Sequence, residues 1–245
     1  MQEHELWITA LFNRFLAGPA NRALDLFGLK VEDPAHPWAN WMAMEILVFF
    51  ICIVLFAALR RRMSVDKPGK VQHVFEVIYQ FVGNSADEVG VQHSGRYVAY
   101  FGTLFIFILF CNLIGVIPTF ESPTMFPMVP AGLAICTFAY YNFMGLKEQG
   151  VFGYLKHFAG PIWWLAPLMF PIEIVSHLAR PLSLTIRLFA NMFAGEQVTL
   201  AFLKLTFLIA PAIFMGLHVF VSLLQAYIFM LLTMIYVSSA VEHEH

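Results

Sequence analysis

The tract from residue 161 to residue 211 reads PIWWLAPLMFPIEIVSHLARPLSLTIRLFANMFAGEQVTLAFLKLTFLIAP and is apolar along almost its whole length. It is about 50 residues long, whereas a helix perpendicular to the bilayer needs only about 20. The simplest arrangement is one long helix over about 163–208, strongly tilted or parallel to the membrane and kinked at Pro171 and Pro181. A second long apolar helix, over about 213–240, follows Pro211, so the two are expected to pack as a hairpin.

Composition supports a membrane protein. Hydrophobic residues make up 60% of the 245 residues and charged residues only 12%, with a mean hydropathy of +0.72. We therefore expect an all-α integral membrane protein.

Apolar runs predict three spans besides the hairpin, at about 41–60, 98–118 and 126–146, which gives about five membrane-embedded helices. Residues 68–90 are too polar to span, but their apolar side chains recur at three- and four-residue steps, which is typical of an amphipathic helix on the membrane surface.

The distribution of positive charge predicts the topology. Cytoplasmic loops carry an excess of lysine and arginine, and these residues gather on one side of the predicted spans: Arg60, Arg61, Arg62, Lys67, Lys70, Lys147 and Lys156. That side is expected to be cytoplasmic, as is the C-terminus. Residues 1–37 are then an extracytoplasmic segment with an interfacial helix, and residues 38–245 form the membrane domain. The net charge of −2 gives no basic footprint for nucleic acid.

The long apolar tract nevertheless carries several polar side chains, among them Glu173, His177, Arg180, Arg187, Asn191, Glu196 and Lys204. Polar groups inside a membrane are costly, so each is a functional candidate. Each also has an ordinary explanation, because lysine can snorkel to the interface, asparagine can bond helix to helix and histidine can pack in a core. Arg187 differs, since its guanidinium stays charged at any cellular pH and only an anion or water can offset its burial.

Helix geometry leaves Arg187 without a partner on its own helix. On a regular helix Arg180, Arg187 and Asn191 share one face, whereas Glu196 lies about 180° round from Arg187. Glu173 is closer in angle but about 21 Å away along the axis. We therefore expect Arg187 to face a carboxylate on another chain or an aqueous cavity, while Glu196 faces elsewhere.

The last predicted helix carries a polar stripe. His218 and Gln225 are seven residues apart, which is two turns along one helix face, and Ser222 lies between them on nearly the same side. The stripe runs along a helix that is otherwise as apolar as lipid.

Two segments resemble a known family. The segments PIEIVSHLARPLSLTIRLFANMFAGE and LHVFVSLLQAYIFMLLTMIYVSSAVEHEH closely resemble subunit a of the bacterial F-type ATP synthase, and FCNLIGVIP looks like the same family. The similarity extends over the chain from about residue 38. One position departs from the family pattern, because the acidic residue that often stands three positions after the asparagine of CNLIG is Gly115 here.

The resemblance implies roles for seven residues and for several partners. Arg187 would face the rotating ring of subunit c, with Asn191 and Gln225 as polar neighbours. Glu196 and His218 match positions associated with the outer proton path, and Glu173 and Ser176 match the cytoplasmic path. The chain would be a multi-pass stator subunit of a bacterial inner membrane, in contact with the c ring, the peripheral-stalk subunit b and lipid, without a cofactor, metal or nucleotide of its own.

The implied function is proton translocation through two aqueous half-channels separated by Arg187. A ring carboxylate facing lipid must be protonated, while one opposite Arg187 is stabilised as an anion. Two alternatives stay open. One is an independent proton or cation channel or transporter. The other is a metal-dependent intramembrane enzyme using Glu173, His177, Glu196 and His218, although no HExxH-type signature is present.

Overall fold

The computed structural model describes residues 6–26, 36–64, 68–117, 120–159, 166–205 and 209–241. Within these ranges there are seven α-helices and no strand. The helices are α1 (Trp7–Leu26), α2 (Asn40–Arg62), α3 (Lys70–Glu88), α4 (Val98–Leu113), α5 (Met128–Ala159), α6 (Ala166–Leu205) and α7 (Ile209–Val241). Three 3-10 helices connect them, η1 (Ser94–Arg96), η2 (Ile114–Val116) and η3 (Pro123–Met125). The expected all-α membrane fold is confirmed.

Four stretches among the described residues are long and apolar enough to cross a membrane: Asn40–Arg62, Val98–Val116, Met128–Gly150 and Ala212–Val241. Helices suit this setting because they satisfy their own backbone hydrogen bonds where no water is available. Helix α5 continues to Ala159, past the expected end near 146, but it bends at Gly150, where φ is 72°. The fifth membrane-embedded helix is α6, whose apolar sequence contains the polar side chains named above.

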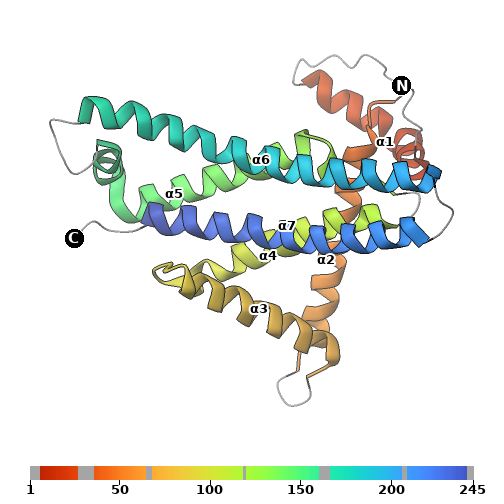
Figure 1. Ribbon diagram of the computed structural model, residues 1–245, viewed down its shortest axis with the longest axis horizontal. Helices are drawn as coiled ribbons and strands as arrows, with labels where there is room; N and C mark the ends of the chain where they lie inside the picture. Colours follow the sequence, from red (N-terminus) through yellow and green to blue (C-terminus); the bar gives the residue numbers. More distant parts are fainter. Residues whose placement is uncertain are drawn as a thin grey trace.

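Helices α6 and α7 form the expected long hairpin. Helix α6 has 40 residues and passes through Pro171 and Pro181, and α7 has 33. At about 1.5 Å per residue α6 is about 60 Å long, twice the thickness of the hydrocarbon core, so it must be strongly tilted. Figure 1 shows the two helices lying alongside each other and running across the direction of α2.

The main core lies where α6 and α7 pack on α4 and α5. From α6, Leu184, Leu188 and Met192 are buried at four-residue steps, which places them on one helical face. They join buried side chains of α7, among them Phe229 and Met230. This shared face fixes how the two long helices are rotated about their own axes, and therefore where their polar residues lie.

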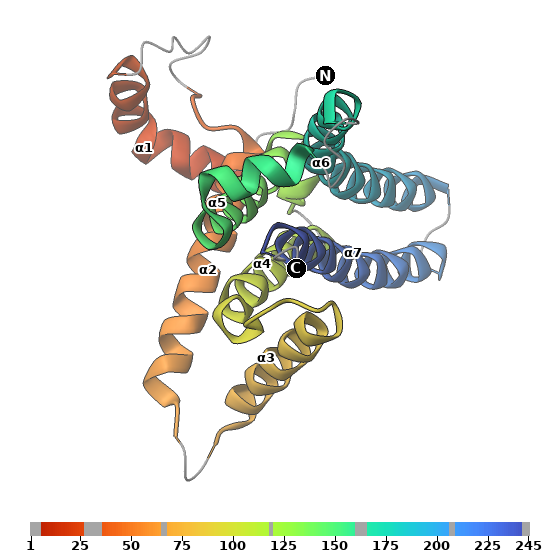
Figure 2. The same ribbon diagram turned by 90° about the vertical axis from the view of Figure 1, so that its left-hand side faces the viewer.

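A second, smaller core holds α1 and α2 against α4. Figure 2 shows α1 at one end of α2. Side chains anchor α1 to the start of α2. Asn13 accepts a hydrogen bond from the backbone N–H of Trp38 at 3.0 Å and donates one to the Trp38 carbonyl at 3.3 Å. Asn40 accepts from the backbone N–H of Leu6 at 3.2 Å. Helix α1 is thus held at the end of α2 opposite to Arg60–Arg62.

Candidate functional site at the hairpin

Arg187 lies near the middle of α6 and is half-buried. Its guanidinium forms no hydrogen bond or ion pair with any residue in the described part of the chain. Neither does a carboxylate lie on α6 within one turn of it, since the neighbouring charged side chains on this helix are Arg180 and Glu196. A permanent cation in an apolar helix therefore has its strongest potential partner outside the described chain.

One turn after Arg187, the hairpin is bridged by a hydrogen bond between two amides. Asn191 on α6 donates from Nδ2 to Oε1 of Gln225 on α7 at 2.7 Å. Gln225 is only 2% exposed, whereas Asn191 lies at the surface. The bond fixes the register of α6 against α7 immediately beside the arginine.

A second polar group lies toward the end of α6, where Glu196 and His218 come from the two helices. The His218 ring packs against the backbone at Gly195: a Cβ added there would lie 2.8 Å from Nδ1 of His218. Only glycine allows this close approach. Within the described residues, neither Oε2 of Glu196 nor Nε2 of His218 has a hydrogen-bond partner, although both atoms are buried.

The connection between α4 and α5 contributes a network of buried polar side chains. Thr124 donates to Oδ1 of Asn112 at 2.6 Å, and the Ser122 hydroxyl donates to the Cys111 carbonyl at 2.9 Å. Asn112 also donates to the backbone carbonyl of Ser222 at 3.4 Å, which ties α4 to α7. The segment η3 packs against α6, and the charge of Glu121, just before it, lies within electrostatic range of Glu196.

The same connection explains the departure at Gly115. A Cβ at this position would lie 2.8 Å from Cβ of Ser122 and 2.9 Å from its backbone nitrogen. No side chain fits there unless the α4–α5 connection moves. The acidic residue that the family resemblance leads one to expect at this position is therefore sterically excluded from this chain.

A third polar group lies on the first half of α6. The carboxylate of Glu173 is 3.8 Å from the guanidinium of Arg180, and that guanidinium lies over the ring of Tyr236 on α7, 5.2 Å from its centroid. Both charged side chains are partly exposed. Glu173 therefore has a cationic neighbour seven residues along its own helix, and this neighbour is Arg180 and not Arg187.

His177 faces inward from the same part of α6. Its Nε2 lies 2.9 Å from Oδ1 of Asn142 on α5, and its ring contacts Phe138 and Tyr141 edge to face at 5.4 Å and 5.1 Å. This is the environment of a packed histidine, the ordinary explanation. Ser176, in contrast, is exposed.

The seven residues expected to carry the function thus fall into three groups along the hairpin. Glu173 and Ser176 lie on the first half of α6, Arg187 lies with Asn191 and Gln225 near the middle, and Glu196 and His218 lie toward the turn of the hairpin. Sequence reasoning missed the supporting residues Asn112, Ser122, Thr124, Asn142 and Tyr236. Asn112, a polar residue in an apolar span, offered a signal, whereas Ser122 and Thr124 looked like ordinary loop residues.

The described residues contain no group of three or more His, Cys, Asp or Glu side chains that could hold a metal ion. Glu173 and His177, the pair on which a metal site depended, instead contact Arg180 and Asn142. Nothing in this arrangement favours the metal-dependent enzyme.

A broad apolar surface flanks the central group. Ile186 and Phe193 on α6, and Phe220 and Leu224 on α7, are exposed although they are large and hydrophobic. In a membrane such a surface faces lipid or another subunit.

Comparison with known proteins gives a consistent result. The sequence model of the family described as ATP synthase A chain matches residues 41–238. A protein of Solibacter usitatus called ATP synthase subunit a is 63% identical over 236 residues, which cover 96% of this chain and 100% of that protein. A protein of the same description from Koribacter versatilis is 51% identical over 242 residues, covering 99% of both chains. One from Trichlorobacter lovleyi is 38% identical, covering 96% of this chain and 98% of its own.

Proposed function

Because the chain belongs to the ATP synthase A chain family, we propose that its α6–α7 hairpin passes protons to and from a rotor ring through two half-channels separated by Arg187. Membership of the family makes the chain the proton-translocating stator subunit of a bacterial ATP synthase and a multi-pass protein of the inner membrane. The proposal concerns which residues do this work, and on which side of the membrane each lies.

The observation that carries the proposal is the position of Arg187, which has no partner among the described residues, between two polar groups on one helix. Glu173 precedes it by about 21 Å and Glu196 follows it by about 13 Å along the axis of α6. Water that reached the two carboxylates from opposite sides would remain separated by a permanent positive charge. A proton carried by water is repelled by that charge, so a direct passage is closed.

The outer half-channel would use Glu196 and His218. Buried polar atoms in proteins are nearly always hydrogen-bonded to protein or water. Oε2 of Glu196 and Nε2 of His218 are both buried and have no partner among the described residues. Their chemistry suits sites where water binds and a proton is exchanged, since carboxyl and imidazole groups can both accept and release one.

The cytoplasmic half-channel would begin on the first half of α6. Glu173 is partly exposed and Ser176 is exposed, and both can hydrogen-bond to water. The guanidinium of Arg180 lies 3.8 Å from the carboxylate of Glu173. A proton that leaves the ring therefore meets an acceptor at this end, with water to carry it away.

Rotation follows from the fate of one carboxyl group on the ring. In contact with lipid it carries its proton, because an ionised carboxylate there would be strongly desolvated. At one half-channel the O–H bond breaks and the proton passes to water. The carboxylate then pairs with the Arg187 guanidinium, moves past it, and takes a new proton from water in the other half-channel. Each proton crossing the full field releases about 2.3 kcal/mol per 100 mV, which becomes available as torque.

The exposed apolar side chains of α6 and α7 would contact the ring of subunit c, because a ring carboxylate that pairs with the guanidinium must come close to this helix. The other apolar faces would contact lipid and the peripheral-stalk subunit b. The N-terminus would be extracytoplasmic and the C-terminus cytoplasmic, since Arg60–Arg62 end α2 on the side expected to face the cytoplasm.

Substitution of Arg187 by alanine tests the proposal. Without the cation a ring carboxyl group can pass the stator still protonated, so the half-channels become connected. The variant complex is expected to assemble, to lose proton-driven ATP synthesis and to leak protons through membranes stripped of the soluble sector. Loss of the complex from the membrane, quantified by blotting, would instead show that Arg187 is needed for assembly.

A further inference from the structure

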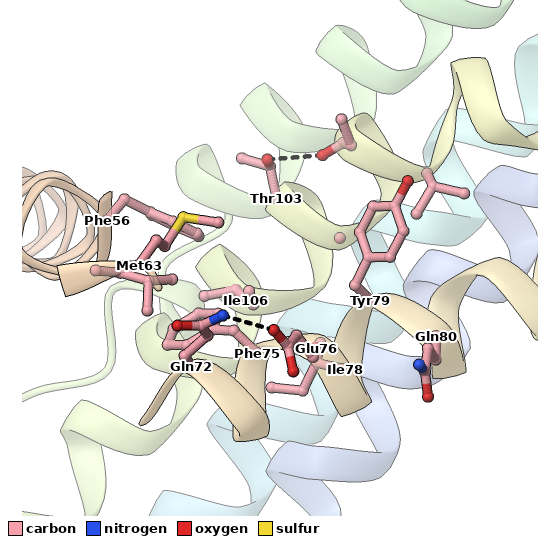
Figure 3. A pocket seen from close by; sticks show the side chains of 14 residues that line it. Phe56, Met63, Gln72, Phe75, Glu76, Ile78, Tyr79, Gln80, Thr103 and Ile106 are labelled. Carbon is pink, nitrogen blue, oxygen red and sulfur yellow. Dashed lines mark hydrogen bonds between the residues drawn. The ribbon is translucent and has the colours of Figure 1, made fainter. Parts of the chain in front are cut away.

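A cavity of about 400 Å³ lies between α2, α3 and α4, far from the polar groups of the hairpin. Figure 3 shows side chains from all three helices directed toward it. Phe56 comes from α2 and Met63 directly follows that helix, Phe75 and Ile78 come from α3, and Ile106 comes from α4. Met63 and Tyr79, which also line it, are 63% and 57% exposed, so the cavity opens at the molecular surface.

The cavity wall is apolar along most of its length. The hydroxyl of Thr103, one of the few polar groups there, donates to the Ala99 carbonyl at 2.7 Å and is satisfied within its own helix. The rings of Phe56 and Phe75 lie 5.5 Å apart and join α2 to α3. A cavity of this kind does not hold water well, because water needs two to four polar partners. It suits a hydrocarbon chain.

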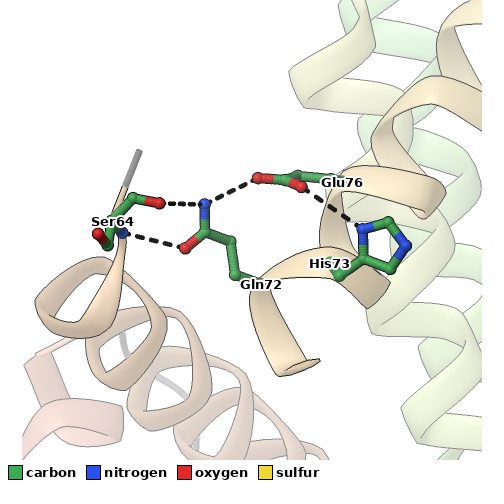
Figure 4. A network of polar contacts seen from close by, with 4 residues as sticks. All are labelled: Ser64, Gln72, His73 and Glu76. Carbon is green, nitrogen blue, oxygen red and sulfur yellow. Dashed lines mark hydrogen bonds and ion pairs between the residues drawn. The ribbon is translucent and has the colours of Figure 1, made fainter. Parts of the chain in front are cut away.

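One end of the cavity is polar and rigidly built. Figure 4 shows the Gln72 side chain joined to the backbone of Ser64 by two hydrogen bonds, of 3.0 Å and 3.1 Å, and to Glu76 by a third of 2.8 Å. Glu76 also lies 3.8 Å from the His73 ring. These contacts hold the end of α2 against the start of α3 and use up the polar atoms of Gln72. They keep this end of the cavity in shape without closing it.

Three arginines lie in the last turn of α2, beside the end of the cavity that also carries the Glu76 carboxylate. Leu59 and Met63 line the cavity, and the exposed residues Arg60, Arg61 and Arg62 lie between them in the last turn of α2. With about 100° per residue, Arg60 and Arg62 flank the face that carries Leu59 and Met63, while Arg61 points away. Arginine binds phosphate oxygens in a planar, bidentate geometry. A phosphate group is therefore complementary in charge to the arginines at the rim, and a hydrocarbon chain matches the apolar interior of the cavity.

We propose that this cavity binds a phospholipid, with an acyl chain between α2, α3 and α4 and the phosphate against Arg60 and Arg62. The lipid would fill the space between the amphipathic helix α3 and the span α2, beside the Phe56–Phe75 ring contact that joins them. It would be a structural lipid held at a defined site, distinct from the lipid that surrounds the rest of the protein.

Photo-crosslinking in the intact ATP synthase complex tests this proposal. A photoreactive phenylalanine derivative replaces Thr103, which is exposed and lines the cavity. The complex is reconstituted in vesicles of phosphatidylethanolamine and phosphatidylglycerol, illuminated and analysed by mass spectrometry. An adduct with the mass of a phospholipid is expected. An adduct with a protein chain of the complex would overturn the proposal and identify a partner helix as the occupant.

Variants that fill the cavity provide the control. A Cβ at Gly102 meets no atom within 4 Å, and Gly102 lines the cavity, so Gly102→Leu places its side chain in the cavity without a clash at Cβ. The phospholipid adduct is expected to fall several-fold. Gly132→Leu is the matched control on α5, because Gly132 is exposed and its added Cβ also meets no atom within 4 Å. An adduct unchanged by Gly102→Leu would mean that lipid contacts Thr103 only as bulk membrane.

The arginines are tested separately, so that the result does not depend on the cavity-filling variant. Arg60→Gln is expected to lower the phospholipid adduct several-fold, whereas Arg61→Gln, on the far side of the same turn, leaves it unchanged. Equal losses in the two variants would overturn the proposed phosphate site. Vesicles of each phospholipid alone show whether its phosphate suffices or an anionic headgroup is required.

Discussion

Asn191 on α6 and Gln225 on α7 are joined by a hydrogen bond of 2.7 Å at the centre of the hairpin. The bond crosses from an exposed side chain to one that is almost fully buried. It therefore links the surface on which Arg187 lies to the interior contact between the two longest helices. Changes on either side of this bond should have different effects on assembly and on proton transport.

We expect Asn191→Leu to destabilise the complex, because it leaves the buried Oε1 of Gln225 without its donor. An unsatisfied buried group costs about 1–3 kcal/mol. The double variant Asn191→Leu with Gln225→Leu removes both partners and should recover part of the loss. Thermal unfolding of the purified complex measures this coupling, and strictly additive effects would show that the bond contributes nothing.

Gly195→Ala should slow proton pumping. Its new Cβ would lie 2.8 Å from Nδ1 of His218, so the ring must move, and such overpacking costs about 1–3 kcal/mol. The matched control is Gly216→Ala on α7, where an added Cβ meets no atom within 4 Å. ATP-driven acidification of vesicles measures both variants. Equal rates in the two would argue against a fixed position for the imidazole.

Replacement of Glu196 or His218 by leucine should slow ATP-driven pumping while the complex remains assembled. Each change removes a group that can exchange protons and leaves the surface beside Arg187 intact. Pumping in inverted vesicles is compared at equal amounts of complex, as judged by blotting. Normal rates in both variants would remove these residues from the outer path.

Arg187→Lys should abolish ATP synthesis even though it preserves a positive charge in water. Lysine lacks the planar guanidinium, and a buried lysine can release its proton, whereas arginine does not. Synthesis driven by an imposed proton gradient is the measurement. Arg61→Lys, at an exposed position at the end of α2, is the control and should behave as wild type. Wild-type synthesis by Arg187→Lys would contradict the need for a permanent charge.

Cysteine labelling tests the orientation of the chain. Cys136 is exposed and is first replaced by serine. Cysteine in place of the exposed Lys70 should then react with a membrane-impermeant reagent only from the cytoplasmic side. Cysteine in place of Arg14, on α1, should react only from outside, because α1 is anchored to the opposite end of α2. Labelling of position 70 in intact cells would reverse the topology.

The fold was largely predictable because the membrane allows few solutions. Without water to satisfy the backbone, long apolar tracts must be helices, and a tract as long as 161–211 cannot stand upright. One long helix containing Pro171 and Pro181 was expected, and α6 passes through both.

The candidate site was predictable only in part. Arg187 could be identified from its own chemistry, since a charge that cannot neutralise always needs an explanation. The contact of His177 with Asn142 could not, because it joins residues 35 positions apart on different helices, and spacing along one helix contains no information about the other. The role of Gly195 depends on its contact with His218 on another helix, so it could not be predicted from the sequence either.

The continuity of α6 has a mechanical consequence. Glu173, Arg187 and Glu196 belong to a single helix, so their separations cannot change independently while a rotor pushes against them. If these residues act as proposed, a ring carboxyl group loses its proton near one of them and regains one near another. The angle through which the ring turns between these two events is then set by distances along α6. The backbone of α6 would therefore fix the distance between the two sites of proton exchange. A flexible insertion anywhere between residues 173 and 196 would change that distance without altering the chemistry of either site.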